Sequence, residues 1–268
     1  MNKPLLPNFI GIGAQRAGST WLNQCLREHP EIYLPRKEIR FFNYNYSKGL
    51  EHYCENFSGL ADQKIWGEIT PDYYRDKEAL ERIATDLKNV KVLFVLRNPV
   101  ERSLSQYQLY KAHGDYTEAT FEDAVNAHPE LIQWSMQGKT LQWLSEMFEQ
   151  KNLLFILYDD IVKTPKAVLQ RILSFLEVDP DFVPSVLNKR VNRVVFPRTQ
   201  NVLKNLGLGK SIDLVKKSPF AHAIKEWGFK VKQDKVSAKT RRELLSAFND
   251  DIASIEKVLN KNLSHWRT

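Results

Sequence analysis

A glycine-containing loop near the amino end is the first segment whose residue types and spacing suit chemistry. Residues 13–20, GAQRAGST, follow a short apolar stretch at 9–12 and precede a helical pattern that begins near Ser19. Backbone N–H groups at the start of a helix, together with the helix dipole, attract an anion. The spacing matches a nucleotide-binding phosphate loop, but Ser19 stands where that loop has its lysine. Arg16 supplies the positive charge instead, so we expect an anion site; a plain strand-to-helix turn is the alternative.

A second candidate anion site follows the apolar run at 92–96. Arg97 ends this run, Pro99 opens a helix, and Ser105 lies eight residues after Arg97. Ligands of open α/β sheets bind outside the carboxyl ends of the strands. An arginine at that edge and a helix hydroxyl can bind one phosphate together. For Ser105 taken singly, a merely exposed residue is the simpler interpretation.

Short apolar runs that alternate with helical patterns surround these two segments. Such alternation predicts an α/β fold, with a mostly parallel central sheet between helices, as in the three-layer sandwich of P-loop proteins. Residues 1–268 are expected to form one domain. Residues 112–140 are weakly periodic and are interpreted as an insertion or lid, and residues 189–235 as a basic lid or substrate segment. The expected strands are 9–12, 32–34, 65–69, 92–96 and 153–157, with helices near 19–28, 80–87, after Pro99, after Pro165 and over 244–259.

The charge of the chain is unevenly distributed. The 268 residues carry a net charge of +7, and residues 189–242 contain 15 Lys and Arg against 3 Asp and Glu. A concentrated basic segment attracts anionic ligands, although a solvated surface is the alternative. Peripheral membrane contact through this segment is compatible with the pattern. No nucleic acid partner is expected, because no known nucleic-acid-binding motif is present.

Length and cysteine usage limit the location of the protein. No apolar run approaches the roughly 18–20 residues of a membrane span, and no secretory signal is recognised at the amino end. Cys25 and Cys54 do not make a disulfide framework. A cytoplasmic protein is therefore expected, and a lumenal fragment separated from its anchor is the alternative.

Six segments, in one order, resemble the sulfotransferases that use 3′-phosphoadenosine-5′-phosphosulfate (PAPS). Glu38-Ile39-Arg40-Phe41-Phe42 is similar to a segment of the heparan sulfate enzymes, and Leu157-Tyr158-Asp159-Asp160 resembles a strand end of the family. The closest motif similarity is to heparan sulfate or other carbohydrate sulfotransferases and to bacterial sulfotransferases. The segments lie at 15–22, 37–43, 46–53, 67–74, 96–107 and 157–160.

The resemblance implies a role for each matching residue. The loop would bind the 5′-phosphosulfate, Arg97 and Ser105 would bind the 3′-phosphate, and Arg193 or Arg198 would complete that contact. Glu38 matches the catalytic base of the family. Arg16 and Ile69 depart from the pattern, because the heparan enzymes often have lysine there; the lost charge at Ile69 weighs against a polyanionic acceptor. The loop residues expected to bind PAPS are Arg16, Ala17, Gly18, Ser19, Thr20 and Trp21.

Sulfuryl transfer should resemble phosphoryl transfer, in which positioning and electrostatic stabilisation dominate. Arg16 and the loop amides would stabilise the leaving bisphosphate nucleotide, adenosine 3′,5′-bisphosphate, and no metal is required. Glu38 would remove the proton of the acceptor. We expect partial burial of Glu38 beside two phenylalanines to raise its pKa, whereas a surface ion pair is the alternative. Candidate acceptor contacts are Glu68, Asp72 and Tyr73.

Two rival functions remain at this level. A kinase with a variant phosphate loop would need a Mg²⁺ ligand, for which Asp159 or Asp160 is available. A non-catalytic module that binds a bisphosphate nucleotide or a polyanion is the other rival. The sequence leaves open the identity of the acceptor, O- versus N-sulfation and the oligomeric state.

Overall fold

A computed structural model of the chain describes residues 5–35, 38–188 and 236–268. Five parallel strands form one sheet in the order β2-β3-β1-β4-β5. Their carboxyl ends therefore share one edge, where an open α/β sheet binds its ligands. The strands are β1 (Phe9–Gly13), β2 (Ile32–Tyr33), β3 (Ile65–Ile69), β4 (Lys91–Leu96) and β5 (Leu153–Leu157).

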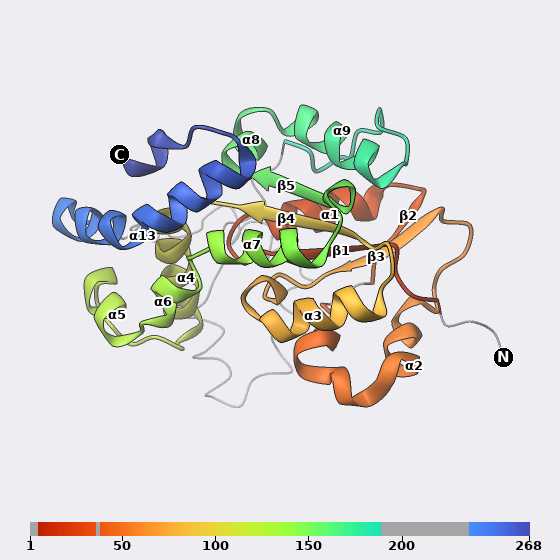
Figure 1. The fold of residues 1–268 in the computed structure, drawn as a ribbon, viewed down its shortest axis with the longest axis horizontal. Coiled ribbons are helices and arrows are strands. Elements are labelled where there is room, and N and C mark those ends of the chain that lie inside the picture. The colour runs from red at the N-terminus through yellow and green to blue at the C-terminus, as the bar shows by residue number, and fades with distance from the viewer. Residues whose placement is uncertain (1–4, 36–37, 189–235) are drawn as a thin grey trace, which may run out of the picture. The chain divides into compact units, whose positions relative to one another are not determined.

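Helices connect the strands and flank the sheet. Figure 1 shows the strands between helices, with α3 and α7 side by side on one face of the sheet. The helices are α1 (Ser19–Glu28), α2 (Gly49–Cys54), α3 (Lys77–Asp86), α4 (Pro99–His113), α5 (Phe121–Ala127), α6 (Glu130–Gln133), α7 (Gly138–Met147), α8 (Tyr158–Lys163), α9 (Pro165–Leu176) and α13 (Ala238–Leu259). Short helical turns are η1 (Phe41–Asn45), η2 (Tyr46–Lys48), η3 (Glu55–Phe57), η4 (Tyr73–Arg75), η5 (Gln150–Asn152) and η6 (Ser264–Arg267).

The chain divides into two compact units. The first contains residues 1–99, 136–191 and 247–268, and therefore the whole sheet; the second contains residues 100–135 and 192–246. Within the second unit, the buried Arg102 donates to the Ser135 hydroxyl at 3.0 Å, and Arg241 pairs with Glu101 at 2.6 Å. Each unit thus has its own polar contacts as well as its own buried side chains.

Apolar patterning and local caps explain why these elements form. The β4 side chains from Val92 to Leu96 are buried, as expected for a central strand covered on both faces. Helix α3 begins where the Asp76 carboxylate accepts from the Ala79 amide at 3.1 Å, an N-cap that satisfies a donor lacking an intrahelical partner. Pro165 occupies the first turn of α9, where its missing N–H costs nothing.

The expected sheet and its flanking helices are confirmed. Residues 112–140, interpreted as an insertion or lid, include α5, α6 and the start of α7, which were not expected. Phe121 and Leu131 of these helices are at most 1 % exposed. The two helices have only seven and four residues, too few to show a clear helical period. The basic segment 189–235 lies outside the described residues.

Candidate active site

The phosphate loop leaves β1 in a conformation that requires glycine. Gly13 has φ 132, and a Cβ there would lie 2.4 Å from the carbonyl oxygen of Pro71. Gly18 has φ 103 and forms the N-cap of α1. Backbone of this kind costs a side-chain-bearing residue considerable strain. The two glycines therefore let the loop pass close to the β3 end and then enter α1.

The start of α1 has the features of an anion site. No side chain caps the helix, and no acidic residue lies in its first turn, so the positive end of the helix dipole is not neutralised locally. Arg16 precedes it with φ 70, in the left-handed region. Ser19 is half-buried and Thr20 is exposed, whereas Trp21 is 5 % exposed. The hydroxyls of Ser19 and Thr20 are therefore better placed to meet a ligand than the indole of Trp21.

The Arg97 side chain contacts the backbone of Arg16. Arg97 follows β4, the neighbour of β1 in the sheet. Its Nη1 donates to the carbonyl oxygen of Arg16 at 2.6 Å, and its guanidinium carbon lies 4.5 Å from the centre of the Tyr158 ring. This contact places the Arg97 side chain beside the phosphate loop. The roles of both arginines in nucleotide binding stay predictions.

Sequence reasoning missed the residues that hold the Arg97 backbone. Gln137 Oε1 accepts from the Arg97 amide at 3.0 Å, and Gln137 Nε2 donates to the Arg97 carbonyl at 2.7 Å. Asp251 of α13 in turn accepts from the amides of Gln137 and Gly138 at 2.9 and 2.8 Å. No sequence motif around Gln137 or Asp251 predicts that these residues contact the Arg97 segment. Tyr158 carried a signal, because it lies directly after a predicted strand in a segment with family resemblance.

Glu38 is exposed, contrary to the expected partial burial. Its side chain is 42 % exposed and pairs with Arg40 at 2.8 Å. Both Arg40 donors reach Oε2, and within the described part of the chain no group donates to Oε1. Phe41 and Phe42 are buried among other aromatic rings, so they turn away from Glu38 instead of covering it. Arg40 has φ 54, and this reversal of the chain separates the acid from the rings.

The three candidate acceptor contacts are buried. Glu68, Asp72 and Tyr73 are 1 %, 4 % and 0 % exposed, and direct contact with an acceptor would require them to be exposed. Asp72 pairs with Arg75 at 3.6 Å. Glu68 accepts from Tyr53, Thr70 and Tyr73. Buried side chains of this kind are suited to supporting the site and not to contacting a substrate.

Burial raises the pKa of Glu68 to about 7, an effect that its hydrogen bonds from Thr70, Tyr53 and Tyr73 only partly offset. In the unfolded chain the pKa returns towards its ordinary value of 4.5. Between pH 4.5 and about 7, the folded protein therefore keeps the Glu68 proton that the unfolded chain has already released. The stability that the folded protein gains from this proton is lost as the pH rises through this range. We expect wild type to lose about 3 kcal/mol relative to Glu68→Gln between pH 4.5 and 8. Urea unfolding of both proteins across this range checks the difference, and parallel stability profiles would contradict it.

The remaining candidates lie elsewhere in the chain. Ser105 is a half-buried residue of α4 in the second unit, and Arg193 and Arg198 lie outside the described residues. Asp159 accepts from His265 and Trp266 at 2.9 and 2.6 Å. No cluster of His, Cys, Asp and Glu suited to a metal ion occurs among the residues that the structure describes.

Asp160 pairs with Lys261 at 2.9 Å. Both acids considered as Mg²⁺ ligands for a kinase are thus engaged by residues near the carboxyl end of the chain.

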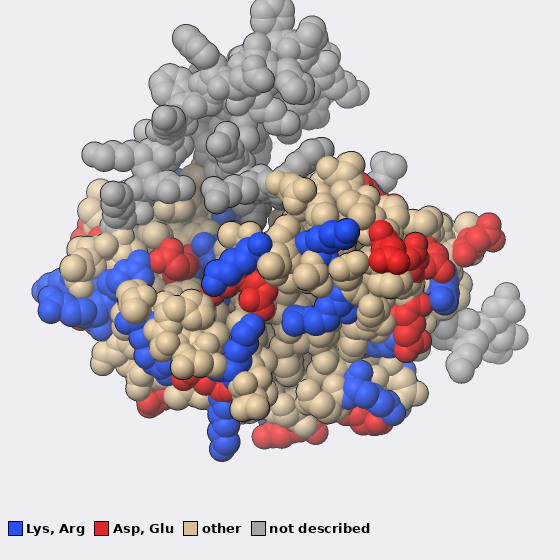
Figure 2. All heavy atoms as spheres, turned by 90° about the horizontal axis from the view of Figure 1, so that it is seen from above, with Lys and Arg blue, Asp and Glu red and all other residues tan. Residues whose placement is uncertain are grey.

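Of the helices described, none has the length and apolar character needed to cross a bilayer. On the face shown in Figure 2, basic and acidic side chains of the described residues are interspersed.

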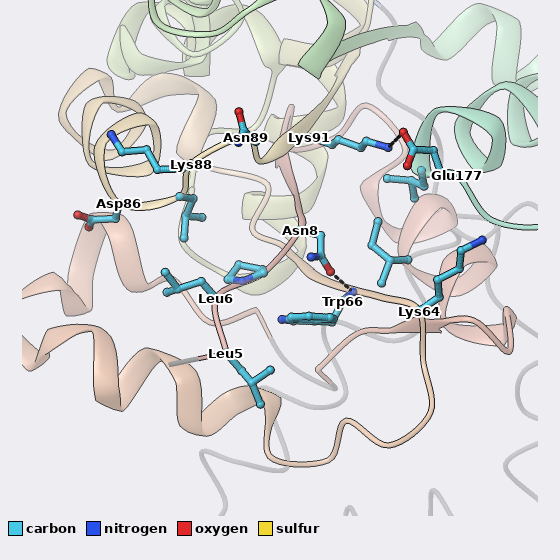
Figure 3. Close-up of a pocket in the computed structure, with 14 residues that line it drawn as sticks. Leu5, Leu6, Asn8, Lys64, Trp66, Asp86, Lys88, Asn89, Lys91 and Glu177 are labelled. Carbon is cyan, nitrogen blue, oxygen red and sulfur yellow. Dashed lines mark hydrogen bonds and ion pairs between the residues drawn. The ribbon is translucent and has the colours of Figure 1, made fainter. Parts of the chain in front are cut away.

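A separate cavity of about 650 Å³ lies at the opposite edge of the sheet. Figure 3 shows Trp66 and Asn8 in this cavity, together with Lys91, whose Nζ pairs with Glu177 at 2.8 Å. These residues precede or begin strands β1, β3 and β4. The cavity is therefore remote from the carboxyl edge that carries the phosphate loop and Arg97.

The parallel sheet and the loop between β1 and α1 define an α/β protein with a P-loop-like fold. The family description "Sulfotransferase domain" matches residues 6–257. The chain therefore belongs to the sulfotransferase domain family, and the match includes residues of both compact units.

Two curated relatives each match more than half of the chain. A membrane-associated sulfotransferase, kil1, of Dictyostelium discoideum is 37 % identical over 155 residues, or 54 % of this chain and 32 % of that protein. Human heparan sulfate glucosamine 3-O-sulfotransferase 3B1 is 30 % identical over 179 residues, or 64 % of this chain and 46 % of that protein. The matches thus cover less than half of the length of these relatives.

Solved structures support the fold. A sulfotransferase from Alicyclobacillus acidocaldarius superposes with a TM-score of 0.75 at 21 % identity, covering 98 % of this chain and 99 % of the other. A mouse sulfotransferase complexed with PAP superposes with a TM-score of 0.56 at 15 % identity, covering 95 % and 89 %. The α/β architecture expected from the sequence is therefore shared with known sulfotransferases.

Proposed function

We propose that the chain transfers a sulfuryl group from PAPS to an acceptor hydroxyl or amine. The observation that carries this proposal is the contact between the two motif arginines, in which Arg97 donates to the Arg16 carbonyl at 2.6 Å. A nucleotide with phosphate groups at its 5′ and 3′ positions needs two anion sites side by side. Membership of the sulfotransferase family and the PAP complex of a similar structure support the same nucleotide.

The described residues fit a bound nucleotide of this kind. When bound, PAPS supplies the sulfuryl group, and negative charge develops on its 5′-phosphate as that group leaves. Arg16 and the first amides of α1 stabilise this charge, because donors fixed before the reaction need no reorganisation during it. Arg97 binds the 3′-phosphate, with Ser105 as its proposed partner and Arg193 or Arg198 as a further contact.

Glu38 acts as the base. The carboxylate is held through Oε2 by Arg40, which leaves Oε1 to accept the proton of the attacking hydroxyl. A base must lie within hydrogen-bond reach of the proton that it removes, and an exposed carboxylate at the substrate edge is accessible to an acceptor.

A carbohydrate or another small molecule is the proposed acceptor class. The human relative is named for heparan sulfate glucosamine, which favours a sugar hydroxyl. At the end of β3, this chain has Ile69, 5 % exposed, where the heparan enzymes often have lysine, and this difference disfavours a highly anionic glycan. A cytoplasmic location also stays a proposal, since one relative is described as membrane-associated.

Calorimetric titration tests the nucleotide assignment. We expect adenosine 3′,5′-bisphosphate to bind without Mg²⁺, and adenosine 5′-monophosphate, which lacks the 3′-phosphate, to bind more weakly. Transfer from radiolabelled PAPS to carbohydrate, phenol and lipid acceptors then identifies the acceptor class. Binding of ATP that depends on Mg²⁺, without affinity for the bisphosphate, would favour the kinase instead. Nucleotide binding without transfer to any acceptor would favour the non-catalytic module.

A further inference from the structure

One buried carboxylate lies behind the loop that carries Glu38. Glu68 is the fourth residue of β3 and is 1 % exposed. Its Oε1 accepts from the Tyr53 and Tyr73 hydroxyls at 2.8 and 3.1 Å, and its Oε2 accepts from the Thr70 hydroxyl at 2.7 Å. The backbone amide of Ile39 is a fourth donor. An ionised carboxylate only accepts hydrogen bonds and has about four lone-pair sites, so four donors match its capacity.

Two of these hydroxyls also contact the loop formed by residues 38–42, called the Glu38 loop below. The Thr70 oxygen accepts from the Arg40 amide at 3.3 Å, and the Tyr73 oxygen accepts from the Phe42 amide at 3.3 Å. A hydroxyl has one hydrogen to donate. Because each hydrogen is directed to Glu68, each oxygen is left to accept from the loop. The direction of the whole network therefore depends on an acceptor at Glu68.

We propose that Glu68 is a positioning residue for the reaction: through Thr70, Tyr73 and a direct bond to Ile39 it holds the Glu38 loop in place. The inference rests on the proposed function of Glu38 as base. The amides of Arg40 and Phe42 are thereby linked to Glu68 through a hydroxyl, and the amide of Ile39 contacts it directly. Glu68 itself does not touch substrate.

Aromatic packing reinforces the same loop. The Phe41 ring stacks on the Tyr53 ring, with centroids 4.6 Å apart, and the Phe42 ring meets the Tyr73 ring edge-on at 5.8 Å. Tyr53 and Tyr73 thus contact the loop through their rings while their hydroxyls donate to Glu68. The rings limit where the loop can lie, and the hydrogen bonds determine which way its backbone faces.

A purely structural role would not require a carboxylate here. Burying an ionised group is costly even when it is hydrogen-bonded, and the raised pKa of Glu68 reflects that cost. A glutamine of the same shape would avoid it. Glutamine, however, carries an NH₂ donor in place of one acceptor oxygen, so at least one hydroxyl must reverse and lose its alignment with the loop amide.

The test compares variants at pH 8, where wild-type Glu68 is ionised. Misplacement of a reacting group by about 1 Å costs roughly 100-fold in rate, so we expect Glu68→Gln to lower kcat by about 10- to 100-fold. The Kd for adenosine 3′,5′-bisphosphate and the KM for PAPS should stay within about two-fold, because the phosphate loop is not altered. Hydrogen exchange of the amides of Ile39, Arg40 and Phe42 should accelerate.

Matched variants separate positioning from folding. Thr70→Val removes the hydroxyl that links Glu68 to the Arg40 amide and should lower kcat as Glu68→Gln does. Thr70→Ser keeps that hydroxyl and should have a kcat near that of wild type. Thermal unfolding of each variant identifies any that has lost its fold. Unchanged exchange at the three amides in folded Glu68→Gln would overturn the proposal, as would equal losses of kcat and nucleotide affinity. If wild type sulfates no acceptor, the proposed function fails, and the exchange experiment still decides whether Glu68 holds the loop.

Discussion

Replacement of Glu38 by glutamine should lower kcat by about 10²- to 10⁴-fold, the range typical of a lost general base. The amide has nearly the shape of the carboxylate but cannot take up the proton of the attacking hydroxyl. Affinity for adenosine 3′,5′-bisphosphate should be unchanged, because the phosphate loop and Arg97 belong to other segments of the first unit. Single-turnover transfer from radiolabelled PAPS measures the chemical step directly.

Glu81→Gln is a suitable control for this experiment. Glu81 is an exposed carboxylate on α3 that pairs with Lys77, and its replacement should leave kcat unchanged. A fall in kcat of less than about three-fold in Glu38→Gln would show that another group removes the proton, against the 10²-fold minimum expected of a base.

Replacement of Arg97 by alanine is expected to weaken binding of adenosine 3′,5′-bisphosphate by about 10- to 150-fold. This range corresponds to about 1.5–3 kcal/mol for a hydrogen bond to a charged group. Arg97 donates to the Arg16 carbonyl, so the substitution also removes a support of the phosphate loop. Titration calorimetry measures both the affinity and the enthalpy of binding.

A second nucleotide separates the two effects of Arg97. If Arg97 binds the 3′-phosphate, Arg97→Ala should weaken the bisphosphate far more than adenosine 5′-monophosphate. Equal weakening of both nucleotides would mean that Arg97 acts only through the loop. Arg97→Lys keeps the charge but loses the planar fork of donors, and we expect it to bind with intermediate affinity.

Most of the fold could be predicted from the sequence, because the signals are local. The run at 92–96 is apolar at every position and is buried throughout, and the helix predicted at 19–28 has these bounds in the structure. A continuous apolar run indicates a strand that is buried on both faces of a sheet, and this can be recognised without knowing which strands lie beside it. Helices α5 and α6 were missed because short helices carry few periodic positions.

For the candidate site, the sequence indicated several residues but not how exposed each of them is. The loop at 13–20 and Arg97 were proposed because each follows a strand, and carboxyl ends of parallel strands meet at one edge. Glu38 was proposed from family resemblance, and its exposure was misjudged. Adjacent side chains on a loop can face opposite ways, and Arg40, at φ 54, reverses the chain between Glu38 and the buried rings.

The residue types alone therefore indicated the class of protein, the strands of its sheet with five of the flanking helices, and the positive charges available to an anion. Tertiary structure decided which distant groups lie beside the candidate residues: Gln137 and Asp251 hold the backbone at Arg97, and Thr70, bound to Glu68, contacts the Glu38 loop. Hydrogen bonds between residues far apart in the chain leave no periodic trace in the sequence. Such partners become visible only when the sheet brings its strand ends to one edge.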